Sequence, residues 1–277
     1  MTSTATEPLA PEPPTAPEPP TAPRTTTAPD QPAPRPVVVL DGLGKTFGSG
    51  QSQNTVLEDV DLTIGQGEFV ALLGASGCGK STLLNLIAGL EAPSKGAMEI
   101  PSDGVAFMFQ DANLFPWLTA QGNVELALEL RGVPKAERKT KAEALLALVH
   151  LQHAGKKRPH ELSGGMRQRV ALARSLAQDK HVLLMDEPFA ALDAITRDLL
   201  HEELTRIWRH TGRTIVFVTH NVREAVRLGQ RVLLLSSRPG KVIREWRIDD
   251  AQKQPEQAAL LADEMTAALR QEISRHV

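Results

Sequence analysis

The sequence predicts an α/β protein with a largely parallel β-sheet. Short runs of Val, Ile and Leu recur along the chain and alternate with segments of helical periodicity. Some of these runs, such as residues 69–73, are apolar on both faces, which is typical of a strand in the middle of a sheet that helices cover. Strands that alternate with helices favour a parallel sheet.

The individual strands follow from the apolar runs and from the turns between them. Residues 37–40, 56–64 and 68–73 are expected strands, with Gly65-Gln66-Gly67 as the turn between the last two. A helix is expected at residues 80–90, after the third strand. The doubly apolar texture returns in three later runs, at residues 182–185, 215–218 and 232–235.

Two other segments are predicted to be helical. Between Asn123 and Ala177 leucines recur at three- and four-residue spacings, which indicates a helical insertion into the core over about residues 111–177. In residues 257–277, apolar side chains recur every four residues from Leu261 to Ile273. We interpret this segment as an amphipathic helix packed on the body, because a membrane-surface helix requires a richer basic face.

Composition limits the functional classes. The chain has 277 residues and 41% hydrophobic residues, enough for one large globular domain or two small ones. The net charge is -2, and residues 1–36 alone carry two arginines and four acidic residues, so the remainder is electrically balanced. This balance argues against a nucleic-acid-binding domain. A single cysteine excludes an internal disulfide and fits a reducing compartment.

The N-terminal segment is unlike the rest of the chain. Residues 1–36 hold twelve of the 20 prolines, and the hexamer Ala-Pro-Glu-Pro-Pro-Thr occurs at 10–15 and again at 16–21. We expect a disordered tail rich in polyproline II, and favour a passive solubilising role over a ligand for a proline-recognition domain. The chain has neither a secretory signal core nor an apolar run near the roughly 20 residues that span a bilayer. Membrane association is therefore expected only through a partner.

A glycine-rich loop predicts phosphate binding. The segment Gly74-Ala75-Ser76-Gly77-Cys78-Gly79-Lys80-Ser81 fits G-x-x-x-x-G-K-[ST] between a buried strand and a helix. Its glycines let backbone N–H groups face the β-phosphate, and the helix N-terminus adds a favourable dipole. Lys80 supplies a charge to the β- and γ-phosphates, and the Ser81 hydroxyl completes a Mg²⁺ shell.

Cys78 within this loop allows two interpretations. A helix N-terminus lowers the pKa of a thiol, which suggests a redox sensor. The side chain is equally a small filler, and we favour that interpretation. Alkylation of the thiol is expected to hinder ATP binding.

A buried strand ends in two carboxylates at residues 181–187. Neighbouring residues on a strand point in opposite directions, so the two acids have different roles. Asp186 is expected to hold Mg²⁺, directly or through water, and Glu187 to polarise the attacking water as general base. Four apolar residues before this pair and Pro188 after it argue against a solvated loop.

A second helix start lies at Leu162-Ser163-Gly164-Gly165-Met166. Ser163 suits the N-cap position, the two glycines leave backbone N–H groups uncovered, and the residues from Met166 to Ala177 have helical composition. These features predict a second anion-binding helix N-terminus.

In this order the segments resemble the ATP-binding subunit of an ABC transporter, over a range from about Val37 to at least Val242. The resemblance assigns Gly74–Ser81 and the adjoining Thr82 to the Walker A loop, 162–166 to the signature, Asp186-Glu187 to Walker B and 191–193 to the D-loop. It also identifies Phe47 as the aromatic residue that stacks on adenine, Gln110 as the Q-loop glutamine that reaches toward Mg²⁺ and water, and His220 as the switch histidine. A lone aromatic near a glycine-rich turn is also often a packing residue, and that alternative stays open for Phe47.

The resemblance implies a P-loop NTPase core with an N-terminal antiparallel β subdomain and an inserted helical subdomain. It implies an ATPase domain over residues 37–250, a C-terminal helical extension over 251–277, and ATP and Mg²⁺ as cofactors. It further implies a homodimer, in which Ser163, Gly164 and Gly165 of one copy contact the γ-phosphate held by the other and Asp193 also binds nucleotide. Met166 replaces the usual glutamine, which removes a side-chain amide and leaves the backbone donors.

Residues 109–119 and 235–242 are similar to ATPase subunits of nitrate, sulfonate and taurine importers. This similarity implies a bacterial importer for a small anion, peripheral on the cytoplasmic face of the membrane. Its partners are integral-membrane permeases and, indirectly, an extracytoplasmic solute-binding protein. The alternatives are another import or export system, or an ABC ATPase outside transport, although those typically carry two cassettes or a long coiled-coil insertion.

Overall fold

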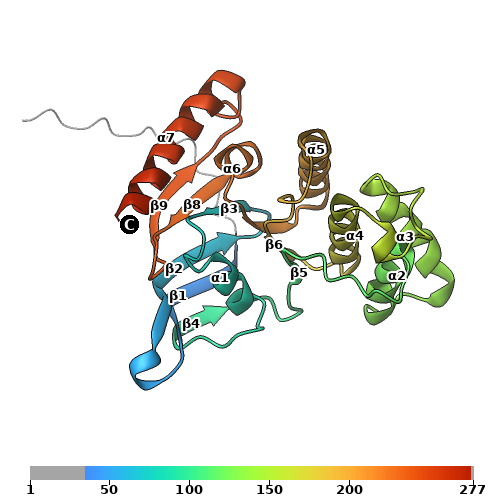
Figure 1. The fold of residues 1–277 in the computed structure, drawn as a ribbon, viewed down its shortest axis with the longest axis horizontal. Helices are drawn as coiled ribbons and strands as arrows, with labels where there is room; N and C mark the ends of the chain where they lie inside the picture. Colours follow the sequence, from blue (N-terminus) through green and yellow to red (C-terminus); the bar gives the residue numbers. More distant parts are fainter. Residues whose placement is uncertain (1–34, 276–277) are drawn as a thin grey trace, which may run out of the picture. The chain divides into compact units, whose positions relative to one another are not determined.

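The computed structural model describes residues 35–275, which form two β-sheets with helices around them (Figure 1). The smaller sheet is antiparallel, with strand order β2-β1-β4. Its strands are β1 (Pro36–Phe47), β2 (Asn54–Gly65) and β4 (Lys95–Glu99). The tail predicted over residues 1–36 lies almost entirely outside the described residues.

The larger sheet has six strands in the order β5-β6-β7-β3-β8-β9. Every neighbouring pair is parallel except β8 and β9, which are antiparallel. The strands are β3 (Phe69–Leu73), β5 (Ala106–Met108), β6 (Val182–Asp186), β7 (Thr214–Val218), β8 (Arg231–Leu235) and β9 (Val242–Arg247). The predicted α/β fold with a largely parallel sheet is confirmed.

Alternate residues of the central strands pack into different cores, because successive side chains point to opposite faces of a sheet. Val70 and Leu72 face the core that α1 shares with the antiparallel sheet. Phe69 faces the core of the helices beyond β5 and β6, and Ala71 faces the core of α6 and α7. All five residues of β3 are buried, as its doubly apolar sequence predicts.

The helices fall into two groups along the larger sheet (Figure 1). Three of them belong to the inserted segment: α2, α3 and α4 contact one another, and α4 contacts β5. Of the two short 3-10 turns, Pro159–Glu161 lies in this insertion and Gly50–Ser52 lies between β1 and β2. At the other edge α6 packs on α7. The helices are α1 (Lys80–Ile87), α2 (Ala120–Leu130), α3 (Lys135–Leu148), α4 (Gly164–Ala177), α5 (Ala194–Thr211), α6 (Val222–Leu228) and α7 (Pro255–Ser274).

Some elements differ from the sequence-based expectation. The first strand continues to Phe47, because register irregularities let β1 bend while it pairs with both β2 and β4. Strands β4, β5 and β9 were not predicted: β4 is mostly exposed and carries Gly96 at φ 82°, and β9 is an edge strand in which three of the six residues are charged. Helix α1 ends at Ile87, three residues early.

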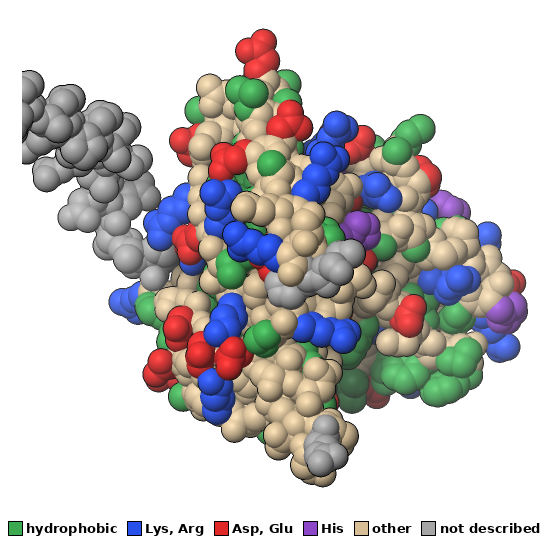
Figure 2. All heavy atoms as spheres, turned by 60° about the vertical axis from the view of Figure 1, so that its left-hand side comes forward, with side chains coloured by type: hydrophobic (Ala, Val, Ile, Leu, Met, Phe, Trp, Pro, Cys, Tyr) green, Lys and Arg blue, Asp and Glu red, His purple; other side chains and the backbone are tan. Residues whose placement is uncertain are grey.

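The surface mixes charges of both signs. On the face drawn in Figure 2, acidic and basic side chains lie interspersed. Within residues 35–275, no helix combines the length and the apolar character that a bilayer crossing requires.

Candidate functional site

The glycine-rich loop opens onto a pocket of about 460 Å³ at the carboxyl ends of the central strands. Parallel α/β sheets commonly bind ligands at this edge. Nine of the predicted site residues line the pocket: Ser76, Gly77, Gly79, Lys80, Ser81, Thr82, Gln110, Glu187 and His220. Three further lining residues were not predicted: Asn54, Val56 and Arg238.

The loop positions Lys80 at the first turn of α1. Gly79 is the N-cap with φ 101°, a conformation that favours glycine, and a Cβ there would lie 2.7 Å from Leu57 Cδ2. The Lys80 ammonium is buried and donates to the carbonyl oxygens of Gly74 at 2.8 Å and Ala75 at 2.9 Å. The Lys80 ammonium therefore lies against the loop that precedes α1, and the backbone N–H groups at the start of this helix would attract phosphate to the same place.

Cys78 lies beneath the loop. Its side chain is 1% exposed, and its Sγ is 3.8 Å from Lys80 Nζ. A Cβ added to Gly74 would lie 2.6 Å from the same sulfur. This close packing favours the filler interpretation over an accessible redox sensor.

Asp186 supplies a buried carboxylate beside Ser81. Burial raises the pKa of Asp186, a hydrogen bond with Ser81 opposes the shift, and the charge of Glu187 adds to it. A divalent cation would relieve this desolvation, and a hydroxyl with one carboxylate is the oxygen set that Mg²⁺ takes alongside phosphates. Among residues 35–275 no group of three or more His, Cys, Asp or Glu could hold a metal ion. The residues fit Mg²⁺ that arrives with a phosphate ligand, and not a metal held by protein alone.

Glu187 and His220 form a polar pair over the loop. The distance between His220 Nδ1 and Glu187 Oε2 is 3.1 Å. Glu187 has φ 45°, unusual for a residue with a side chain, and its N–H donates to the Val218 carbonyl at 3.0 Å. Backbone strain of this kind concentrates at functional sites. The pair faces the same pocket as Lys80 and Ser81.

Gln110 is connected to α4 through its backbone. The Gln168 side-chain amide donates to the Gln110 carbonyl. Arg174, also on α4, donates to the carbonyls of Ala112 at 2.8 Å and Asn113 at 2.7 Å. The segment that carries Gln110 therefore follows the position of α4.

Comparison with known proteins identifies the family. The model of the family described as ABC transporter matches residues 57–190. The chain is 46% identical over 211 residues to the taurine import ATP-binding protein of Pseudomonas putida, an alignment that covers 73% of this chain and 80% of that protein. The chain belongs to the ABC transporter family. The predicted resemblance is confirmed.

Two further matches describe the extent of this ABC cassette. It is 48% identical over 216 residues to the bicarbonate transport ATP-binding protein of Synechococcus elongatus, covering 74% of this chain but only 33% of that longer protein. A solved dimeric ATP-binding cassette, in a post-hydrolysis state bound to ADP and Pi, matches with a TM-score of 0.70 and 35% identity. That match covers 77% of this chain and 99% of the solved chain. ATP binding by the cassette is thereby supported.

The signature segment of the ABC cassette lies outside the pocket. Ser163 is the N-cap of α4, is exposed, and its Oγ accepts from the Met166 N–H at 3.2 Å. A Cβ on Gly165 would lie 2.8 Å from Leu192 Cδ2, so glycine permits close packing against the D-loop. Neither Ser163, Gly164 nor Gly165 lines the pocket of its own chain.

Asp193 and Phe47 also lie outside the pocket lining. Asp193 is the N-cap of α5, and its Oδ1 accepts from the Thr196 N–H at 2.9 Å, which lowers the pKa of this carboxyl. Phe47 ends β1, is 39% exposed, and has the Lys45 ammonium 4.7 Å from its ring centroid. Both the stacking and the packing interpretation of Phe47 stay open.

Arg238 is the most informative residue that the sequence analysis missed. Its Nε donates to the Gly77 carbonyl at 3.2 Å, so a second cation reaches the glycine-rich loop from the segment between β8 and β9. The next residue but one, Gly240, bonds to β2 through the Val56 carbonyl at 2.8 Å. The similarity of residues 235–242 to importer subunits was the one sequence signal there.

Proposed function

We propose that this chain is the ATP-hydrolysing subunit that powers a bacterial ABC importer for a small anion such as nitrate, a sulfonate or taurine. The observation that carries the proposal is the Glu187–His220 pair, 3.1 Å apart, in the same pocket as the Lys80 loop. A carboxylate and an imidazole over a phosphate-binding loop provide what ATP hydrolysis requires. The taurine import relative supports the transport role.

The glycine-rich loop binds the ATP phosphates. On binding, Lys80 exchanges its two carbonyl partners for β- and γ-phosphate oxygens, which are stronger partners because they are charged. Ser81 and Asp186 would hold Mg²⁺, which neutralises charge that develops on the phosphates. Residues 74–82 thus orient the nucleotide. The aromatic ring of Phe47 would stack on the adenine.

Glu187 then acts as the general base. Its carboxylate accepts the hydrogen bond of the attacking water, while His220 contacts the γ-phosphate and keeps the carboxylate in line. The contact with His220 orients the Glu187 carboxylate at the end of β6. Gln110 approaches the same water from the segment attached to α4.

A second copy completes each site. Ser163 and the two glycines after it form the start of α4, and none of the three lines the nucleotide pocket of its own chain. In the proposed homodimer, Ser163, Gly164 and Gly165 of one copy contact the γ-phosphate of the other, and Asp193 lies at the same junction. The dimeric solved cassette supports this arrangement.

The remaining assignments follow from the importer role. The ATPase domain covers residues 37–250 with its helical insertion at about 111–177, and residues 251–277 form a C-terminal extension. The protein lies on the cytoplasmic face of the membrane, attached to permease subunits that receive solute from a separate binding protein.

The test is ATP hydrolysis by the complex reconstituted with its permease and binding protein. A panel of nitrate, taurine, alkanesulfonates and bicarbonate is added in turn. We expect one small anion to stimulate phosphate release, and removal of Mg²⁺ to abolish it. Absence of ATPase activity in both the isolated chain and the complex would overturn the proposed function.

A further inference from the structure

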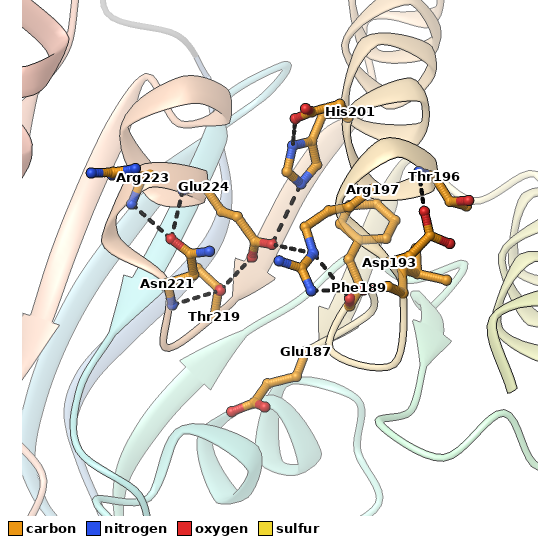
Figure 3. Close-up of polar contacts among 12 residues, drawn as sticks. Glu187, Phe189, Asp193, Thr196, Arg197, His201, Thr219, Asn221, Arg223 and Glu224 are labelled. Atoms are coloured by element: carbon orange, nitrogen blue, oxygen red, sulfur yellow. Dashed lines mark hydrogen bonds and ion pairs between the residues drawn. The ribbon is translucent and has the colours of Figure 1, made fainter.

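Glu224 on α6 lies at the centre of a buried network that the catalytic assignment does not use (Figure 3). The residue is 7% exposed, and its two carboxylate oxygens have different partners. Oε2 accepts from the Thr219 hydroxyl at 2.6 Å, whereas Oε1 lies 3.4 Å from Arg197 Nε and 3.6 Å from His201 Nε2. A buried carboxylate needs such partners to stay charged.

The Thr219 side of the network fixes the backbone around His220. Besides donating to Glu224, the Thr219 hydroxyl accepts from the Asn221 N–H at 3.0 Å. The Asn221 side chain in turn caps α6 by accepting from the Arg223 N–H at 3.0 Å. Both residues that flank His220 are therefore attached to the first turn of α6, the turn that carries Glu224.

The Arg197 side fixes the segment that follows Glu187. Arg197 Nη2 donates to the Leu192 carbonyl at 2.8 Å, and Nε donates to the Phe189 carbonyl at 3.4 Å. These two carbonyls belong to the short segment between Glu187 and Asp193. Leu192 is also the side chain against which Gly165 packs. The Glu224 carboxylate thus connects the segment that follows Glu187, through Arg197, with the residues that flank His220, through Thr219.

We propose that Glu224 is a positioning residue that couples the segment 189–193, which includes the D-loop, to the placement of His220, through Arg197 on one side and Thr219 on the other. The proposal rests on the proposed ATPase function. Movement of Leu192 against the signature segment would displace Arg197, and the shared carboxylate transmits that displacement to Thr219. A demonstrated energetic coupling between the two ends is the physical requirement for such a connection.

The test uses the purified full-length chain with four substitutions. Glu224→Gln keeps the shape but removes the charge, Thr219→Val removes the hydroxyl, and Thr219→Ser keeps it. Glu68→Gln is the matched control, because Glu68 also pairs with an arginine, Arg231, at 2.9 Å, but at the opposite end of β3 from the glycine-rich loop. ATP affinity, kcat and thermal unfolding are measured for each.

We expect Glu224→Gln and Thr219→Val each to lower kcat about tenfold with ATP affinity within about twofold of wild type. Thr219→Ser should restore kcat, and the Glu224→Gln, Thr219→Val double variant should lose less than the product of the single losses. Glu68→Gln should lower the unfolding temperature and leave kcat unchanged. If Glu224→Gln does not fold, the Thr219 pair alone decides the outcome.

Unchanged kcat in Thr219→Val, or equal losses in Thr219→Val and Thr219→Ser, would overturn the coupling. So would fully multiplicative losses in the double variant. Each of these results leaves the proposed function standing if wild type hydrolyses ATP and Glu187→Gln does not. Wild type that is inactive both as the isolated chain and in the reconstituted complex, by contrast, overturns the proposed function itself.

Discussion

The glycine-rich loop and the signature segment both lead into the N-terminus of a helix, yet the chain surrounds them differently. Residues 74–81 lead into α1, with Lys80 buried among loop carbonyls and with Arg238 and the Glu187–His220 pair alongside. Ser163 is exposed at the start of α4, and Gly165, two residues later, packs against Leu192. The start of α1 lies in a pocket, whereas Ser163 at the start of α4 is exposed and lies outside that pocket. This difference is what the proposed homodimer requires, in which one chain binds the nucleotide and the signature segment of a second copy completes the site.

The largest effect is expected from a substitution in the pocket of the glycine-rich loop. Glu187→Gln removes the general base while keeping the shape of the side chain, and we expect kcat for ATP hydrolysis to fall by roughly 10³-fold. ATP affinity should be retained, because the Lys80 loop is untouched. Phosphate release under single-turnover conditions is the measurement. Glu99→Gln, an exposed carboxylate on β4, serves as control, and wild-type turnover by Glu187→Gln would remove Glu187 from its assigned role.

The second prediction concerns Ser163 in the signature segment, at the start of α4. Ser163→Phe places a bulky group at the exposed start of α4, and we expect hydrolysis to fall on the order of a hundredfold because the second copy no longer fits. Nucleotide binding by the isolated monomer should not change. Fluorescent-nucleotide titration and phosphate release separate the two quantities.

Ser163→Ala provides the matched control for that experiment. It removes the N-cap hydrogen bond to Met166, worth about 1 kcal/mol of helix stability, but leaves the backbone donors open. Its activity should stay well above that of Ser163→Phe. Loss of ATP affinity in the monomeric Ser163→Phe variant would place Ser163 in the pocket of its own chain and erase the distinction between the two helix starts.

The third prediction concerns the buried network of Glu224. Burial raises the pKa of Glu224, but His201, Thr219 and Arg197 together outweigh burial and hold the pKa below its ordinary value of 4.5. A carboxyl with a lowered folded-state pKa stabilises the protein above its unfolded pKa, and the contribution disappears as pH falls through the folded value. Wild type should therefore exceed Glu224→Gln in free energy of unfolding by about 2 kcal/mol near pH 7.

This difference should shrink as the pH falls below 4.5. Urea unfolding followed by tryptophan fluorescence provides the measurement, with Glu99→Gln, a substitution of an exposed carboxylate on β4, as the control variant. A difference between wild type and Glu224→Gln that grows on acidification would contradict the charge state assigned to the network.

The smallest expected effect concerns Arg238. Its guanidinium lies against Gly77, so Arg238→Ala should weaken ATP binding about fivefold, equivalent to about 1 kcal/mol for one exposed charge-assisted contact. Arg244→Ala, an exposed arginine on β9, is the control. An unchanged ATP affinity in Arg238→Ala would show that Arg238 does not contribute to nucleotide binding.

Much of the fold could be predicted because the central strands are buried on both faces. β3, β6 and β7 have apolar side chains at nearly every position, and such a pattern has few alternative explanations. β4 and β9 could not be predicted in this way, because β4 contains Gly96 and β9 pairs on one edge only. β4 is a strand because it hydrogen-bonds to β1, which is distant in sequence, and β9 because it pairs with β8, the strand directly before it in the chain.

The same distinction applies to the site. The glycine-rich loop is contiguous, so its residues appear together in the sequence and lie together in the pocket. Asn54 and Arg238 reach the pocket only through the pairing of β2 with the segment that contains Gly240. Glu224 and Arg197 carry no motif at all. Their roles depend on two loops and two helices meeting in space.

The packing of Cys78 has a practical consequence. The chain has one cysteine, and its thiol is enclosed beneath the glycine-rich loop. A cysteine introduced at an exposed position away from the start of α4, such as Leu260 on α7, would therefore be the one accessible thiol for a maleimide dye or spin label. Distances between labelled copies could then report opening and closing of the cassette during turnover, without first removing a native residue.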